Sequence, residues 1–362
     1  MWRSKAPEFG EPSYGHWYTP LTWIVLIVSF TNLSFAQDSE KPAKPTTTTI
    51  AEGLNRPTGF AFDENSGTVY LAECGANRIS KIVDGKPVPF IEGFTVTPNG
   101  FGFEGGTVDV GFCGSNWMVV SALVKEKGDT SVAFFDMSVL NFLTGDVVWS
   151  GKKAHHKVQI PSRGKYNTGG LRNITSGESA VYICGEINLD PGGAILKVAK
   201  PTSDKRPRSV RYLIPGKIND NARFHASDCI AISPENYVVF AERVEEQSVL
   251  NFVGENGQIN GRFPTGLSHV TAFAYGPNHG DLFLSDFATG AIYKLIEADN
   301  ESGCQTERVM DLESVTAMKF NAAGELYVTQ LGPKTATDGG KLLKITGLDV
   351  AQNSEVEVGG GQ

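Results

Sequence analysis

The chain has 362 residues, 40% hydrophobic and 20% charged, a balance typical of a soluble globular protein. Its formal net charge of −8 argues against a general affinity for nucleic acid or for anionic membranes. The 41 glycines and 18 prolines favour many short strands joined by tight turns.

The first 36 residues have the pattern of an export signal. Residues 21–30 form an apolar core after two basic residues, and Ser34-Phe35-Ala36 is a small-x-small cleavage sequence. The apolar core is too short to span a bilayer comfortably. We therefore predict cleavage after Ala36, a secreted or periplasmic location, and no stable membrane insertion of the mature chain. An uncleaved anchor is the alternative, because the segment before the apolar core is long and contains acidic residues.

Residues 37–45 read as a polar linker and residues 349–362 as a polar tail. Between them, a unit of strand, turn, strand, loop and strand is repeated six times. The units lie at residues 57–82, 105–136, 169–198, 227–253, 269–295 and 314–345. Matching apolar positions in their second strands are 44 to 65 residues apart, a spacing typical of propeller blades. The alternation is that of strands and not of helices.

A fourth, outer strand is expected between consecutive units, but none follows the sixth. The segment 46–52, before the first unit, has strand composition and can fill that vacant edge. Such pairing joins the two ends of the domain and removes an open sheet edge. We therefore predict an all-β fold, a single six-bladed β-propeller at residues 46–348 whose last blade is closed by an N-terminal strand.

The first unit contains Leu-Ala-Glu-Cys-Gly-Ala-Asn-Arg-Ile at residues 71–79, and the fifth contains the looser Leu-Ser-Asp-Phe-Ala-Thr-Gly-Ala-Ile at 284–292. These segments resemble the signature of the NHL-repeat family, within the gluconolactonase-like group of six-bladed propellers. That group includes lactonases, in which Glu, Asn and Asp from different blades hold a metal, and purely interacting propellers. The resemblance implies the fold and leaves the activity open.

In a propeller blade, the loop before the first strand and the loop after the second lie on the same face, near the central channel. Two sets of residues are therefore expected to gather there. The second strands end at Glu73, Ser121, Glu186, Glu242, Asp286 and Gln330, and the first strands are preceded by Thr58, Glu104, Arg172, His225 with Asp228, His269 and Glu313.

Carboxylates around a channel mouth suit a hard cation such as Ca²⁺. The candidate metal ligands are Glu186, Glu242 and Asp286, with His225 or His269 as a catalytic base. For Asp286 the alternative is a structural role in fixing the turn that it begins. Arg172 and Asp228 are expected to bind the ligand. Glu73 belongs to the most regular unit, so for this acid we favour a structural role in fixing its turn.

Two further features are open at this stage. The stretch 125–160 departs most from the repeat and is either a partner surface or a decorated outer edge, with His155 and His156 on its surface. Among the five scattered cysteines, Cys184 and Cys229 lie in consecutive units and could meet, or could be small buried side chains.

The sequence favours an exported binding module that holds a small molecule or protein on its channel face and acts as a monomer. The alternative is a Ca²⁺-type lactonase or esterase. A quinone-dependent sugar dehydrogenase is a third hypothesis, disfavoured because only five histidines follow the signal segment. The substrate, the disulfide pairing and the oligomeric state do not follow from the sequence.

Overall fold

The computed structural model describes residues 44–348 of the chain, with short gaps. The gaps are residues 95–96, 99–103, 106, 123–130, 143–147, 160–167, 188–192, 202–205, 208, 215–216, 220–221, 224–226, 278–280, 300–302 and 334–335. The predicted signal segment, most of the linker and the polar tail lie outside the described residues. All of the described residues belong to one compact unit.

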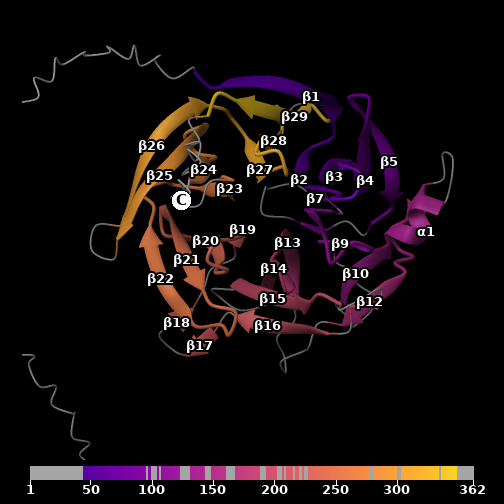
Figure 1. Ribbon diagram of the computed structural model, residues 1–362, viewed down its shortest axis with the longest axis horizontal. Helices are drawn as coiled ribbons and strands as arrows, with labels where there is room; N and C mark the ends of the chain where they lie inside the picture. Colours follow the sequence, from indigo (N-terminus) through magenta and orange to yellow (C-terminus); the bar gives the residue numbers. More distant parts are fainter. Residues whose placement is uncertain are drawn as a thin grey trace, which may run out of the picture. The chain divides into compact units, whose positions relative to one another are not determined.

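Six sheets succeed one another around a central axis, in chain order (Figure 1). Blade 1 contains β2 (Pro57–Phe62), β3 (Val69–Glu73), β4 (Arg78–Val83) and β5 (Lys86–Glu92), with the short η1 (Cys74–Ala76) after β3. Blade 2 contains β8 (Val110–Phe112), β9 (Trp117–Val120), β10 (Ser131–Asp136) and β12 (His156–Gln159). Blade 3 contains β13 (Thr168–Ser176), β14 (Ala180–Ile187), β15 (Gly193–Ala199) and β16 (Val210–Ile214).

The second half of the ring repeats this order. Blade 4 contains β19 (Ser227–Ile232), β20 (Val238–Val244), β21 (Gln247–Val253) and β22 (Ile259–Pro264). Blade 5 contains β23 (Val270–Tyr275), β24 (Leu282–Asp286), β25 (Ala291–Asp299) and β26 (Gly303–Asp311). Blade 6 contains β27 (Val315–Phe320), β28 (Leu326–Gln330) and β29 (Gly340–Thr346). The first strand of every blade is innermost, as the repeat pattern predicts.

The N-terminal strand β1 (Thr46–Leu54) completes blade 6. It pairs antiparallel with β29, from Thr46 opposite Thr346 to Leu54 opposite Gly340. Figure 1 shows the indigo β1 alongside the yellow β29. The predicted closure of the ring by an N-terminal strand is therefore confirmed, and the outermost edge of the last blade is covered by the other end of the domain.

The core lies between the blades. Each of six hydrophobic clusters in the described residues combines side chains of two neighbouring blades. Tyr70 and Phe135, for example, belong to the cluster between blades 1 and 2, and Phe60 and Leu342 to the one between blades 6 and 1. Because every blade supplies both faces of its sheet to this core, its second strand is mostly apolar up to the polar residue near its end.

The stretch between β10 and β12 decorates the outer edge of the ring. It contains α1 (Met137–Phe142) and β11 (Trp149–Ser150), and β11 pairs in parallel with β5 of blade 1. His155 and His156, expected at the surface, are half-buried: His155 Nδ1 accepts a bond of 2.9 Å from Asp136 N, and His156 Nε2 lies 2.5 Å from Pro207 O. The described part of this stretch therefore agrees with the interpretation of residues 125–160 as an addition to the outer edge of the ring.

Two short hairpins, β6 (Thr97–Pro98) with β7 (Glu104–Gly105) and β17 (Lys217–Asn219) with β18 (Ala222–Arg223), lie in connections between blades. No helix within the described residues has the length and apolar character needed to cross a bilayer. All five cysteines are free thiols, and four of them are buried. Cys184 and Cys229 therefore behave as small buried side chains in this structure.

Candidate functional site at the central channel

The innermost strands carry a recurring irregularity near the channel. In blades 1, 4, 5 and 6 a register shift inserts one extra residue near the start of the strand, namely Thr58, Asp228, Thr271 and Thr316. Asp109 stands at the corresponding place in blade 2, immediately before Val110. Blade 3 has two such shifts, and the second of them contains Arg172. Bulges of this kind re-aim side chains.

The bulge side chains connect neighbouring blades around the channel. Thr316 Oγ1 donates to Pro57 O at 2.8 Å, and Thr271 Oγ1 donates to Val315 O at 2.7 Å. Thr58 bonds Thr107 O, and Asp109 accepts a bond from Ile174 N at 2.8 Å. The two remaining interfaces, between blades 3 and 4 and between blades 4 and 5, are each bridged by a contact between two ionisable side chains.

Those two interfaces form one network. Arg172 Nη1 donates to Asp228 Oδ1, and His269 Nε2 lies 3.1 Å from Asp228 Oδ2. The exposed fractions of the three side chains are 14%, 15% and 21%, so the network is accessible to solvent. Three of the residues expected at the channel mouth are therefore brought together, from blades 3, 4 and 5.

The contacts define the tautomer of His269. A carboxylate can only accept, so Nε2 carries the proton of the neutral ring and Nδ1 is the proton-accepting nitrogen. Burial, together with the positive charges of Arg243 and Arg172, lowers the pKa of His269 against the opposing effect of Asp286. The charge of Asp228 is largely balanced by Arg172, so the ring stays neutral near pH 7.

The residues that end the second strands mostly hold the chain just before the first strand. Glu73 Oε2 accepts from Asn55 N at 2.8 Å, and Asp286 Oδ1 accepts from His269 N at 2.7 Å. Gln330 Nε2 donates to Glu313 O at 3.0 Å in blade 6. Glu73 also accepts from Arg78 Nε at 2.7 Å and Ser80 Oγ at 2.5 Å. These contacts support the structural role expected for Glu73.

The expected metal ligands have different surroundings. Glu242 is fully buried, and its Oε1 accepts from Asn251 Nδ2 at 3.1 Å and from Arg262 Nη2 at 2.7 Å. Asp286 Oδ2 is buried without a hydrogen-bond partner. The side chain of Glu186 and all of His225 lie outside the described residues. Among the described side chains no group of three His, Cys, Asp or Glu could hold a metal ion.

Two charged residues of the channel were missed in the sequence. Asp109 is fully buried, and its Oδ1 lies 3.5 Å from Lys319 Nζ of blade 6. Burial raises the pKa of Asp109 to about 6, against the lowering effects of Lys319 and of the Ile174 and Val110 amides. Asp109 could have been found, because it occupies the place of Thr58 in its own unit. Lys319 lies within an alternating strand, away from the positions where the repeat predicts channel residues, so the sequence did not point to it.

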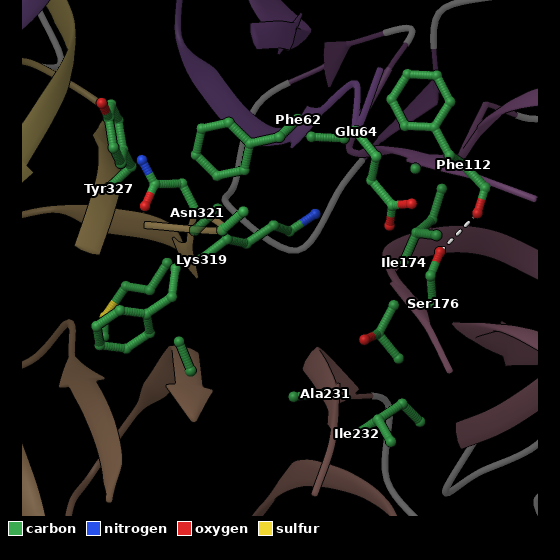
Figure 2. Close-up of a pocket in the computed structure, with 18 of the residues that line it drawn as sticks. Phe62, Glu64, Phe112, Ile174, Ser176, Ala231, Ile232, Lys319, Asn321 and Tyr327 are labelled. Atoms are coloured by element: carbon green, nitrogen blue, oxygen red, sulfur yellow. Dashed lines mark hydrogen bonds between the residues drawn. The ribbon is translucent and has the colours of Figure 1, made fainter. Parts of the chain in front are cut away.

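Below the bulges, the channel widens into a cavity of about 1000 Å³. Its walls are the inner strands of all six blades, and the turns between the first and second strands of blades 1, 2 and 6 line its mouth. It therefore opens on the face opposite to the Arg172–Asp228–His269 network. Figure 2 shows Lys319 and Glu64 extending into it from blades 6 and 1, with Phe62, Phe112, Ile174 and Tyr327 around them.

No protein-family model and no curated protein sequence matches the chain. Solved structures do share its architecture. The PQQ-bound aldose sugar dehydrogenase from Streptomyces coelicolor matches with a TM-score of 0.56 and 16% identity, over 84% of this chain and 99% of that one. A luciferin-regenerating enzyme matches with a TM-score of 0.55 and 14% identity, over 84% and 96%.

A catalytically inactive variant of virginiamycin B lyase from Staphylococcus aureus, with quinupristin, matches with a TM-score of 0.50 and 14% identity, over 83% and 98%. The chain is thus a six-bladed β-propeller of the kind found in sugar dehydrogenases, a luciferin-regenerating enzyme and lyases. At these identities the likeness establishes the fold and not the activity.

Proposed function

We propose that the protein is an exported binding module that holds a small polyhydroxylated acid at the channel mouth formed by blades 3, 4 and 5. The observation that carries the proposal is the network of Arg172, Asp228 and His269, three partly exposed ionisable side chains from three blades. We also propose that the chain is related to the NHL-type and gluconolactonase-like propellers that its first and fifth units resemble.

The argument rests on a contrast within the ring. At three other interfaces, neutral threonine hydroxyls make the corresponding contact between blades. A partly buried ion pair loses hydration and adds little net stability, so ring closure alone does not require one. Departures from a repeat that carry such a cost mark functional positions.

The chemistry of the network suggests the class of ligand. Arg172 supplies planar donors that suit a carboxylate, and Arg243 adds positive charge near His269. Asp228 and the His269 Nδ1 atom are acceptors that suit hydroxyl groups. A molecule with one carboxylate and several hydroxyls satisfies both sets.

Calorimetric titration of the purified protein tests this proposal with D-gluconate, D-glucose and acetate as probes. We expect D-gluconate to bind most tightly, and Arg172→Gln and His269→Gln to weaken its binding at least tenfold. Arg308→Gln is the matched control, because Arg308 lies on the outer strand of blade 5 and pairs with Asp311. Equal affinity in the Arg172→Gln and Arg308→Gln proteins, or no binding at all, would overturn the proposal.

A second candidate function is hydrolysis of a lactone or ester. It is favoured by the neutral His269 ring, whose Nε2 contact with Asp228 leaves Nδ1 as the proton acceptor. His269 Nδ1 would take a proton from water as the water oxygen attacks the carbonyl carbon. The acyl C–O bond of the resulting tetrahedral intermediate would then break, and the departing ring oxygen would receive that proton from His269. The product would be the hydroxy acid held by Arg172. Turnover of D-glucono-1,5-lactone that is lost in His269→Gln would support it, and turnover unchanged in that variant would refute the role of His269.

Calcium and export belong to the proposal as well. Metal analysis of the purified protein, with thermal melting in the presence and absence of EDTA, tests for a bound cation. A melting temperature unchanged by EDTA and a preparation free of metal would refute the calcium hypothesis.

Mass analysis of the mature N-terminus tests the export signal, and we expect the mature chain to begin at Gln37.

A further inference from the structure

We propose that the cavity on the opposite face of the propeller is a second ligand site, which takes an amphipathic carboxylic acid with its carboxylate on Lys319. This site is separate from the network of Arg172, Asp228 and His269, and the proposal does not depend on that one. The two sites would lie at the two ends of one channel, separated by the ring of bulge side chains.

The first observation is the place of Lys319 in the repeat. Lys319 lies on the first strand of blade 6, opposite Tyr327 of the second strand. The residues at the corresponding position of the other five blades are all apolar, namely Ala61, Phe112, Ile174, Ala231 and Ala274. Lys319 is therefore the one charged residue among these six equivalent positions. Hydrophobic packing between the blades does not require a lysine there.

The second observation is the state of the Lys319 ammonium group. Its side chain is 25% exposed, and Nζ reaches across blade 1, 5.7 Å from the centre of the Phe60 ring, to Asp109. The 3.5 Å to Asp109 Oδ1 exceeds the length of about 2.7–2.9 Å of a well-formed charge-assisted hydrogen bond. Asp109 also accepts bonds from the Val110 and Ile174 amides. Lys319 thus has capacity for a second anion from the cavity.

The third observation is the character of the walls. About 1000 Å³ is at the upper end of the volumes of small-molecule sites. Small residues such as Ala61, Ala231 and Ala274 line the space, and Phe62, Phe112 and Tyr327 supply aromatic surface. Figure 2 shows Lys319 with aliphatic and aromatic side chains around it. A long apolar body with one anionic end matches this lining.

Glu64 limits the choice of ligand. Its carboxylate also extends into the cavity, from the turn after β2, and the residue is exposed to solvent (Figure 2). A dianion would be repelled by Glu64, whereas a monoanion that pairs with Lys319 keeps its apolar body near the mouth. Glu64→Gln should therefore strengthen the binding of a monocarboxylate a few-fold.

Calorimetric titration of the full-length protein tests the proposal with octanoate, octanol and acetate. We expect octanoate to bind, octanol to bind at least tenfold more weakly because it lacks the charge, and acetate to bind weakest because it lacks the apolar body. Lys319→Met should weaken octanoate binding at least tenfold and leave octanol unchanged. Octanoate affinity equal to that of octanol, or unaffected by Lys319→Met, would overturn the proposal.

A second variant is needed because Lys319→Met leaves the buried Asp109 without its cation, and a loss of binding could then reflect misfolding. Ala231→Phe fills the cavity from blade 4 without a change of charge, and we expect it to abolish octanoate binding. D-gluconate binding at the other end of the channel should be unchanged in this variant, which separates the two proposals. Octanoate binding that persists in a folded Ala231→Phe protein would place the probe elsewhere and overturn the inference.

Discussion

The Asp109 carboxylate of blade 2 and the Lys319 ammonium group of blade 6 form an ion pair across the channel, with 3.5 Å between Oδ1 and Nζ. Asp109 is fully buried, and a Cβ atom at Gly59 would collide with its carboxylate. The glycine in the Pro-Thr-Gly sequence at the start of blade 1 is therefore required by a buried acid of the next blade.

This burial predicts a pH dependence of stability. The pKa of Asp109 is about 6 in the folded state against an ordinary 3.8, so the folded chain binds the proton more tightly. The stability that the protonated Asp109 carboxyl contributes is fully present below pH 4 and is lost as the pH rises to about 6. The free energy of unfolding of the natural protein, relative to Asp109→Asn, should fall by roughly 3 kcal/mol over that range. Urea titrations at several pH values measure this difference, and a flat difference would contradict the burial of Asp109.

The opposite sign is expected for His269. Its pKa is lowered by burial and by Arg243 and Arg172, so the folded state keeps the ring neutral where the unfolded chain is protonated. The stability that it contributes is complete above pH 6.5 and is lost as the pH falls through the folded-state pKa. Thermal melts of the natural protein and His269→Gln should therefore converge as the pH decreases from 7.5 to 5. Curves that diverge in that range would show that the folded state favours the charged ring.

Glu73 should matter more for stability than an exposed acid that also pairs with a cation. Glu73→Gln removes a buried charge that accepts bonds from Asn55, Arg78 and Ser80, and we expect a loss of about 2–4 kcal/mol in the free energy of unfolding. Glu325→Gln is the control, because Glu325 pairs with Lys344 at the surface and such pairs contribute less than about 1 kcal/mol. Equal losses in urea unfolding would contradict the structural role of Glu73.

Ring closure can be tested at Leu54, the last residue of β1. Its side chain is fully buried in the cluster between blades 6 and 1. Leu54→Ala should lower the free energy of unfolding by about 2–5 kcal/mol, whereas Val83→Ala, at a position that is 42% exposed, should change it little. A single unfolding transition is expected in both proteins, because the closed ring unfolds as one unit. A separate early transition in Leu54→Ala would show that blade 6 opens independently.

The architecture could be predicted because each blade repeats a pattern that depends on local spacing. The recurrence of an apolar position such as Tyr70 in each second strand, and the strand composition of residues 46–52, were sufficient to predict the ring and its closure. The face on which Arg172, Asp228 and His269 meet could also be predicted, because the topology of a blade fixes which loops share a face.

The pairing within that site could not be predicted, because it depends on the register shifts in β13 and β19. A bulge changes which side chain reaches the next blade without altering the repeat. Asp109 and Lys319 were missed for a related reason: their contact links blades 2 and 6 across the channel, over a sequence separation that no repeat pattern encodes. The sequence predicts His155 and His156 at the surface because they lie in an insertion at the rim. Their partners, Asp136 N and Pro207 O, are backbone groups, which no side-chain pattern reveals.

The most direct test of the central claim is a crystal structure of the protein soaked with D-gluconate. We predict that the carboxylate binds Arg172 and that at least one hydroxyl contacts His269 or Asp228 at the mouth formed by blades 3, 4 and 5. Density for the probe at any other place, or a network of Arg172, Asp228 and His269 that excludes the probe at saturating concentration, would contradict the claim.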